Sequence, residues 1–184
     1  MLTHYLQPIE INKCNSWLEE ITQSDHWLDS HVIERKIYQR GTSRANATQR
    51  NASVLARENC KDVYEGFEQY LASISYKLAD AWGICPNISW EGTQIVRYKA
   101  GGFFVPHRDS SDLFPERVIT VIAYLNDDFN GGETSFLDME TDITPKQGAV
   151  VSFPSDLIHS AKPVLSGAKY IFVTWATIEQ VDWI

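Results

Sequence analysis

Short apolar runs separated by turn sequences fill the second half of the chain, and they constrain its fold more than any other feature. From residue 92 onward, segments rich in Gly, Pro, Asn and Asp interrupt these runs. Many short strands with such turns are typical of a sandwich or barrel rather than of βαβ units. We therefore predict a mainly β protein with N-terminal helices, folded as a double-stranded β-helix of the jelly-roll, cupin-like type. The predicted strands are TQIVRYK, FFVPH, RVITVIAYL, ETSFL, GAVVSF, LIHSAKPV and KYIFVTWATI.

One of these runs, RVITVIAYL at residues 117–125, predicts a central strand that is buried on both faces. Successive side chains of a strand point to opposite faces of the sheet. Both alternating sets in this run are largely apolar, which favours a sheet that is covered on both sides. One set is Val118, Thr120, Ile122 and Tyr124, and the other is Ile119, Val121, Ala123 and Leu125.

Two segments of the first half have helical periodicity. Residues 61–83 carry apolar side chains three and four positions apart, and Gly83 follows them as a stop signal. A shorter segment, residues 11–21, has the same spacing. We expect both helices to pack against the β core as structural supports. The apolar stripe of the longer helix is Val63, Phe67, Tyr70, Leu71, Ile74, Leu78 and Trp82.

The chain of 184 residues fits one domain. We expect residues 1–91 to form a helical support and a lid, and residues 92–178 to form the β-helix. Between the two helices, residues 38–56 are rich in Gly, Ser, Thr, Asn and Arg, which predicts a mobile connection. Arg44 and Arg50 of this segment are either solvated or part of a lid that meets an anionic group on a substrate.

Composition and charge limit the classes of partner. The formal net charge of −8 argues against a nucleic-acid-binding surface, which needs a basic patch for the phosphates. The first twenty residues hold no apolar run typical of a signal peptide, and no stretch is apolar enough for a membrane span. We therefore expect a cytoplasmic protein without membrane partners. Cys14, Cys60 and Cys85 fit neither a disulfide framework nor a zinc module, so buried reduced thiols are expected.

The stretch GGFFVPHRDSSD contains the most informative motif, His107-Arg108-Asp109. Side chains at i and i+2 of a strand project to the same side, so His107 and Asp109 converge while Arg108 points away. Of the five histidines, only His107 and His159 lie in the predicted β region. Two imidazoles and one carboxylate match the facial triad of non-haem Fe(II) oxygenases. Such a triad leaves coordination positions open, which a four-ligand zinc site does not.

A chelating cosubstrate such as 2-oxoglutarate would require a cation for its far carboxylate. No arginine follows His159, and the lysines that do are Lys162 and Lys169. Lys162 lies beside Pro163 in a predicted turn, where it is expected to be solvated. Lys169 begins an otherwise apolar strand, where a charge requires a partner. We therefore assign the role to Lys169, with a water-facing charge at the start of the strand as the alternative.

In this order, the motifs resemble those of the prolyl 4-hydroxylase-type Fe(II)/2-oxoglutarate dioxygenases. The resemblance extends over about residues 92–177 and includes VRYKAGG, His-x-Asp, Tyr-Leu-Asn, Gly-Gly-Glu-Thr, the distal histidine and a lysine ten residues later. Each motif is weak alone, but the whole series in this order is highly specific.

The resemblance implies a cofactor set of Fe(II), 2-oxoglutarate and O2, with ascorbate as a further reductant. The implied iron ligands are His107, Asp109 and His159. The implied 2-oxoglutarate contacts are Lys169, Tyr98 and Thr134. Trp175 matches an aromatic residue near the active site, although a core tryptophan would fit its apolar strand equally well. Related halogenases have a small residue in place of Asp109, so a carboxylate there favours hydroxylation, desaturation or cyclisation.

The substrate implied by the resemblance is a prolyl or other amino-acid residue in a peptide or protein. The alternative is a free amino acid or small natural product, whose carboxylate Arg44 or Arg50 would bind bidentately. Arg108 joins these arginines as a substrate contact if a substrate reaches it. A third reading from another class is a non-catalytic sensor that binds metal or 2-oxoglutarate. The complete triad together with Lys169 argues against this sensor.

Overall fold

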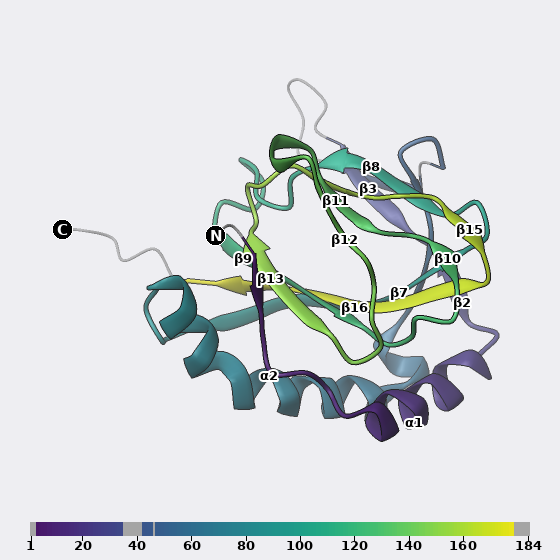
Figure 1. The fold of residues 1–184 in the computed structure, drawn as a ribbon, viewed down its shortest axis with the longest axis horizontal. Coiled ribbons are helices and arrows are strands. Elements are labelled where there is room, and N and C mark those ends of the chain that lie inside the picture. The colour runs from purple at the N-terminus through teal and green to yellow at the C-terminus, as the bar shows by residue number, and fades with distance from the viewer. Residues whose placement is uncertain (1–2, 35–41, 46, 179–184) are drawn as a thin grey trace.

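Two β-sheets pack face to face, and two helices cover the outer face of the larger sheet (Figure 1). The computed structural model describes residues 3–34, 42–45 and 47–178. The larger sheet has the strand order β1-β13-β9-β16-β7-β6-β2, and the smaller one has the order β12-β11-β14-β8-β5. Strands β10 and β15 form a separate pair, as do β3 and β4. This arrangement confirms the predicted double-stranded β-helix.

The described helices are α1 (Ile11–Thr22) and α2 (Lys61–Trp82), with 3-10 turns η1 (Arg57–Asn59) and η2 (Leu137–Met139). The N-terminal strands are β1 (His4–Tyr5), β2 (Trp27–Asp29), β3 (His31–Glu34), β4 (Thr42–Ala45), β5 (Arg50–Asn51) and β6 (Ser53–Leu55). The later strands are β7 (Ser89–Lys99), β8 (Phe103–His107), β9 (Arg117–Tyr124), β10 (Asn130–Gly131), β11 (Thr134–Phe136), β12 (Thr141–Ile143), β13 (Val150–Pro154), β14 (His159–Ala161), β15 (Val164–Ser166) and β16 (Ala168–Thr177).

Strand β9 has the two buried faces that its sequence predicts. It lies between β13 and β16 in the larger sheet. Its residues Ile119, Val121 and Ala123 belong to the apolar cluster beneath the helices. Ile122 and Tyr124 belong instead to the cluster on the sheet's other face. The larger sheet therefore separates a helix-facing core from a second core inside the β-helix.

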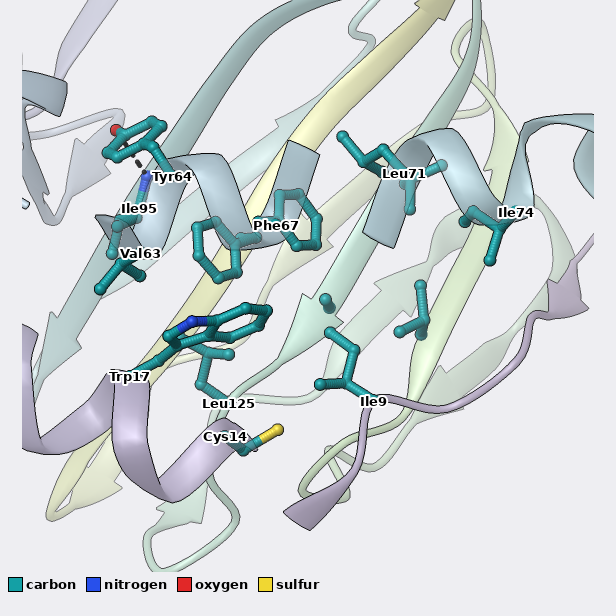
Figure 2. Close-up of a cluster of buried hydrophobic side chains, with 14 of the residues drawn as sticks. Ile9, Cys14, Trp17, Val63, Tyr64, Phe67, Leu71, Ile74, Ile95 and Leu125 are labelled. Carbon is teal, nitrogen blue, oxygen red and sulfur yellow. Dashed lines mark hydrogen bonds between the residues drawn. The ribbon is translucent and has the colours of Figure 1, made fainter. Parts of the chain in front are cut away.

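The helices are held to the sheet by aromatic packing. Figure 2 shows Trp17 of α1 and Phe67 of α2 in one buried cluster. The Phe67 ring stacks on the Phe172 ring of β16 at a centroid distance of 3.9 Å. Trp17 meets the Phe172 ring edge-on at a centroid distance of 5.5 Å. Helix α2 ends as predicted at Gly83, whose φ of 61° is the left-handed conformation that favours glycine. The helices therefore support the sheet, in agreement with their sequence pattern.

The N-terminal region adds strands that its polar composition did not predict. The expectation of a mobile connection over residues 38–56 is wrong for β4, β5 and β6. Strand β6 pairs with β7, and β5 pairs with β8, the strand that carries His107. Backbone pairing needs few apolar side chains when a short strand joins an existing sheet edge. Residues 35–41 and 46 of this connection lie outside the described residues.

Two further observations concern the sequence expectations. Within the part of the chain that the structure describes, no helix has both the length and the apolar character that a bilayer crossing requires. The cysteines are free thiols, as expected. Cys14 and Cys60 are buried as expected, but the expectation of burial is wrong for Cys85, which is exposed after the end of α2.

Candidate metal centre and cosubstrate pocket

Two neighbouring strands of the smaller sheet bring the predicted metal ligands together. His107 ends β8, and His159 begins β14 directly opposite it in the antiparallel register. The two imidazole centroids are 4.3 Å apart. Asp109 follows two residues after His107, and the ligand atoms of all three residues lie within 4.8 Å of one another. Strand pairing therefore builds this three-residue cluster around two histidines that are 52 residues apart in sequence.

Backbone carbonyl groups orient both imidazoles. His107 Nδ1 lies 2.9 Å from the Val105 carbonyl oxygen, and His159 Nδ1 lies 3.0 Å from that of Leu157. A carbonyl can only accept, so each Nδ1 carries the proton and each Nε2 presents its lone pair. The Nε2 atoms lie 3.5 Å and 3.4 Å from the Asp109 carboxylate oxygens. Ligating histidines in metal sites are typically fixed in this way.

The ionisation states of these groups also suit a metal. Burial lowers the pKa of His159 to about 4, against an opposing effect of Asp109, so its imidazole is neutral at pH 7. Burial raises the pKa of Asp109, but His159 and His107 lower it more strongly, and the net pKa lies well below its usual range. A carboxylate and neutral imidazoles are the forms that bind metal ions.

Thr120 and Ser155 hold Asp109 in place, the first through its hydroxyl and the second through its backbone carbonyl. Thr120 Oγ1 on β9 donates to Asp109 Oδ2 at 2.8 Å and lies 3.0 Å from Ser155 Oγ. The Asp109 backbone N–H donates to the Ser155 carbonyl at 2.9 Å. Thr120 and Ser155 are fully buried. Neither residue was predicted from the sequence, although a hydroxyl on the inner face of an apolar strand was the available signal for Thr120.

Lys169 is a buried basic residue that lines the same cavity as this cluster. Its side chain is 1% exposed, and its Nζ donates to the Gly132 carbonyl at 2.5 Å. No carboxylate of the described residues lies within 4.0 Å of Nζ. Burial lowers the pKa of Lys169 to about 7, with Glu133 opposing weakly. A buried ammonium without an anion is costly, which favours a carboxylate ligand at this point.

The other predicted cosubstrate contacts surround Lys169. Tyr98 lies opposite Lys169 in the β7–β16 register, and Lys169 Nζ is 5.5 Å from its ring centroid. Thr134 is buried, and its hydroxyl lies 2.7 Å from that of Tyr124, a residue that sequence analysis did not select. Tyr98, Thr134, Lys169 and the three-residue cluster line one cavity of about 1130 Å³. The structure therefore brings these predicted residues together.

Trp175 lines the same cavity and is 6% exposed. Its indole Nε1 is buried without a hydrogen-bond partner among the described residues, although its proximity contributes to the lowered pKa of Asp109. The Arg117 guanidinium carbon lies 3.8 Å from the centroid of the Trp175 ring. Arg117 also pairs with Glu91 at 2.7 Å. Trp175 is thus both a cavity wall and part of a packed cluster.

The three predicted arginines have different positions. Arg50 is buried on β5 and lines the cavity. Arg108 is exposed at the cavity wall and donates to the Asp156 carbonyl. Arg44 belongs to β4, but its side chain lies outside the described residues.

These residues fit Fe(II) and 2-oxoglutarate. Two histidine Nε2 lone pairs and one carboxylate converge, as a facial triad requires. The cavity continues from this cluster to the ammonium of Lys169, which has no acidic partner in the described part of the chain. The same cavity can therefore hold both the metal and the far carboxylate of a metal-bound cosubstrate.

Comparisons with known proteins point to the same family. Residues 93–177 match the model of the 2OG-Fe(II) oxygenase superfamily. Prolyl 4-hydroxylase subunit alpha-1 of Gallus gallus is 31% identical over an alignment of 130 residues, and the alignment covers 60% of this chain and 25% of the relative. The chain thus spans about a quarter of that relative's length.

Solved structures agree over nearly the whole chain. A viral collagen prolyl hydroxylase from Paramecium Bursaria Chlorella virus-1, solved as its 2OG complex, has a TM-score of 0.62 at 19% identity, covering 98% of this chain and 97% of the other. A prolyl hydroxylase from Trichoplax adhaerens, in complex with a hypoxia inducible factor peptide fragment, has a TM-score of 0.69 at 17% identity, covering 96% and 83%. At these identities the likeness shows the fold. The family model over residues 93–177 and the prolyl 4-hydroxylase relatives support the prolyl 4-hydroxylase-type 2OG-Fe(II) oxygenase superfamily, and the solved structures show the same fold.

Proposed function

We propose that the protein is a 2-oxoglutarate-dependent dioxygenase that hydroxylates an unactivated C–H bond of a prolyl residue in a peptide or protein. The observation that carries the proposal is the buried Lys169 ammonium, which has no acidic partner among the described residues and lines the same cavity as the His107, Asp109 and His159 cluster. A metal site alone suits many functions, but a metal site with a separate buried cation suits a chelating dicarboxylate.

Each residue has a role in this proposal. His107, Asp109 and His159 would hold Fe(II), which with 2-oxoglutarate and O2 supplies the oxidation of the C–H bond. Lys169 would bind the far carboxylate of 2-oxoglutarate, beside Tyr98 and Thr134. Thr120 and Ser155 keep the Asp109 carboxylate in place. The apolar side chains Ile122, Ile171 and Val173 line the cavity and exclude water from the site.

Two features support a peptide substrate. The cavity of about 1130 Å³ exceeds the roughly 300–1000 Å³ of a typical small-molecule site, so it has room for a cosubstrate and a peptide segment. The Trichoplax adhaerens neighbour was solved with a peptide fragment. The carboxylate of Asp109 favours hydroxylation over halogenation, since it occupies the position that a halide would need.

The reaction class is tested by anaerobic addition of Fe(II) and then 2-oxoglutarate, followed by optical spectroscopy. We expect a metal-to-ligand charge-transfer band and, after exposure to air, succinate formation. Asp109→Ala should abolish the band because it removes a ligand, whereas Asp138→Ala, an exposed acid on η2, should keep it. The proposal is wrong if the unaltered protein gives no band. Screening prolyl peptides for a mass gain of one oxygen then tests the substrate.

Several expectations from the sequence stay predictions. These are the cytoplasmic location, the use of ascorbate, the absence of nucleic-acid and membrane partners, and the division into a support-and-lid region and a catalytic core.

A further inference from the structure

A second cation lies near the metal cluster, on the short strand β5. Arg50 is opposite Phe104 of β8 in the antiparallel register. Its guanidinium carbon lies 4.8 Å from the Phe104 ring centroid. The same ring stacks on the His107 imidazole, with centroids 3.5 Å apart and an interplanar angle of 18°. A single aromatic side chain therefore connects Arg50 to a proposed iron ligand.

Arg50 has little compensation for its charge. It is 8% exposed, and its one described side-chain partner is Gln94 Oε1 at 3.5 Å. Its Nε is buried without a hydrogen-bond partner. No carboxylate of the described residues lies within 4.0 Å of its guanidinium, and Asp29, which also lines the cavity, is exposed and makes no ion pair with it.

The other arginines that line the cavity are satisfied. Arg57 pairs with the exposed Glu68, and Arg117 pairs with Glu91. Arg108 donates to a backbone carbonyl. Lys169 has its own proposed anion in 2-oxoglutarate. Once the cosubstrate is bound, Arg50 therefore remains as a buried cavity cation that lacks an anion within the described part of the chain.

We propose that Arg50 and Gln94 form a carboxylate-binding subsite, so that the substrate carries a carboxylate close to the carbon that is oxidised. A buried guanidinium is costly unless it is paired, and its planar fork matches the two oxygens of a carboxylate. The Gln94 amide donates to the same anion through Nε2, since its Oε1 accepts from Arg50. The inference rests on the proposed oxygenase function for its meaning as a substrate site.

A carboxylate that binds at this subsite can come from either of two kinds of substrate. The carboxylate is either the α-carboxylate of a free amino acid or the side chain of Asp or Glu next to the target residue of a peptide. Two matched probe pairs distinguish these sources. The first pair is N-acetyl-L-proline and its amide, and the second is the blocked tetrapeptide acetyl-Ala-Glu-Pro-Ala-amide and its Gln counterpart.

Binding of the four probes is measured by calorimetry on the protein loaded with Mn(II), in place of Fe(II), and saturating 2-oxoglutarate. We expect the carboxylate member of one pair to bind about tenfold more tightly than its amide partner. Arg50→Gln should remove this preference, and Arg50→Lys should restore part of it. Arg57→Gln is the matched control, because this cavity arginine is already paired, and it should keep the preference.

The outcomes separate this inference from the proposed function. Equal binding, or no binding, of both members of each pair to the unaltered protein overturns the subsite. A preference that survives in Arg50→Gln also overturns it. If Arg50→Gln weakens the binding of 2-oxoglutarate itself by more than about tenfold, Arg50 is a cosubstrate contact and the inference is likewise wrong. Because Mn(II) binding needs no turnover, an intact preference without succinate formation contradicts the proposed function alone.

Discussion

Replacing Lys169 by methionine should stabilise the ligand-free protein while removing 2-oxoglutarate binding. Burial lowers the Lys169 pKa from 10.5 to about 7, and each pKa unit corresponds to about 1.4 kcal/mol, so burying the ammonium costs about 5 kcal/mol. Methionine fills a similar volume without a charge. However, methionine leaves the buried Gly132 carbonyl without its hydrogen-bond donor, and this loss destabilises the folded protein by about 1–3 kcal/mol. We expect a net gain of about 3 kcal/mol in the free energy of unfolding at pH 7.

The same substitution should remove the stabilisation that 2-oxoglutarate gives. A ligand at one hundred times its Kd stabilises the folded state by about 2.7 kcal/mol. With Mn(II) present, the unaltered protein should gain this amount from 2-oxoglutarate, and Lys169→Met should gain none. The difference of about 3 kcal/mol between the two proteins should then nearly disappear. Urea unfolding followed by tryptophan fluorescence, with Mn(II) alone and with 2-oxoglutarate added, measures both effects.

Lys162→Met is the control, because Lys162 is exposed and pairs with Asp142 at the surface. This substitution should have little effect on the free energy of unfolding and no effect on the stabilisation by 2-oxoglutarate. A Lys169→Met protein that is less stable than the unaltered one without ligand would show that the ammonium is well compensated. A Lys169→Met protein that still responds to 2-oxoglutarate would show that another residue binds the cosubstrate.

Two further predictions use the same site. The pKa of Lys169 is about 7 in the folded protein and 10.5 in the unfolded chain, so between pH 7 and 10.5 the unfolded chain binds more protons than the folded protein. The free energy of unfolding of the unaltered protein, relative to that of Lys169→Met, should therefore rise from about pH 7 to about pH 9. Urea titrations without ligand measure this difference. A flat difference would contradict the buried charge. Thr120→Val removes the hydrogen bond to Asp109 and should weaken metal affinity about tenfold, measured by Mn(II) titration, whereas Thr141→Val, an exposed threonine, should not.

The strands of the β-helix were predictable because their signal is local. Period-two alternation in RVITVIAYL gave β9 its two faces, and the turn residues placed the boundaries of β8 and β16 close to the observed ones. His107 and His159 were found because few histidines occur in the β region. Their exact opposition across β8 and β14 depends on register, which the sequence does not state.

The N-terminal strands and the surroundings of Arg50 could not be predicted in this way. Strands β5 and β6 are short, and they pair with segments 40 to 54 residues later in the chain. Nothing local distinguishes a polar edge strand from a polar loop, because its stabilisation comes from backbone pairing with a distant partner. The burial of Arg50 has the same origin, since Phe104 covers it only after β5 joins β8.

The spacing between the metal cluster and the cosubstrate cation depends on how the two sheets pack. His107 and His159 lie on the smaller sheet, whereas Lys169 and Tyr98 lie on the larger one. Phe153 of the larger sheet meets the His159 imidazole edge-on at 4.7 Å, so the inner core touches a proposed ligand directly. A close-packed core transmits small changes in volume to its neighbours. The inner apolar cluster therefore fixes the site's dimensions as well as the stability of the fold.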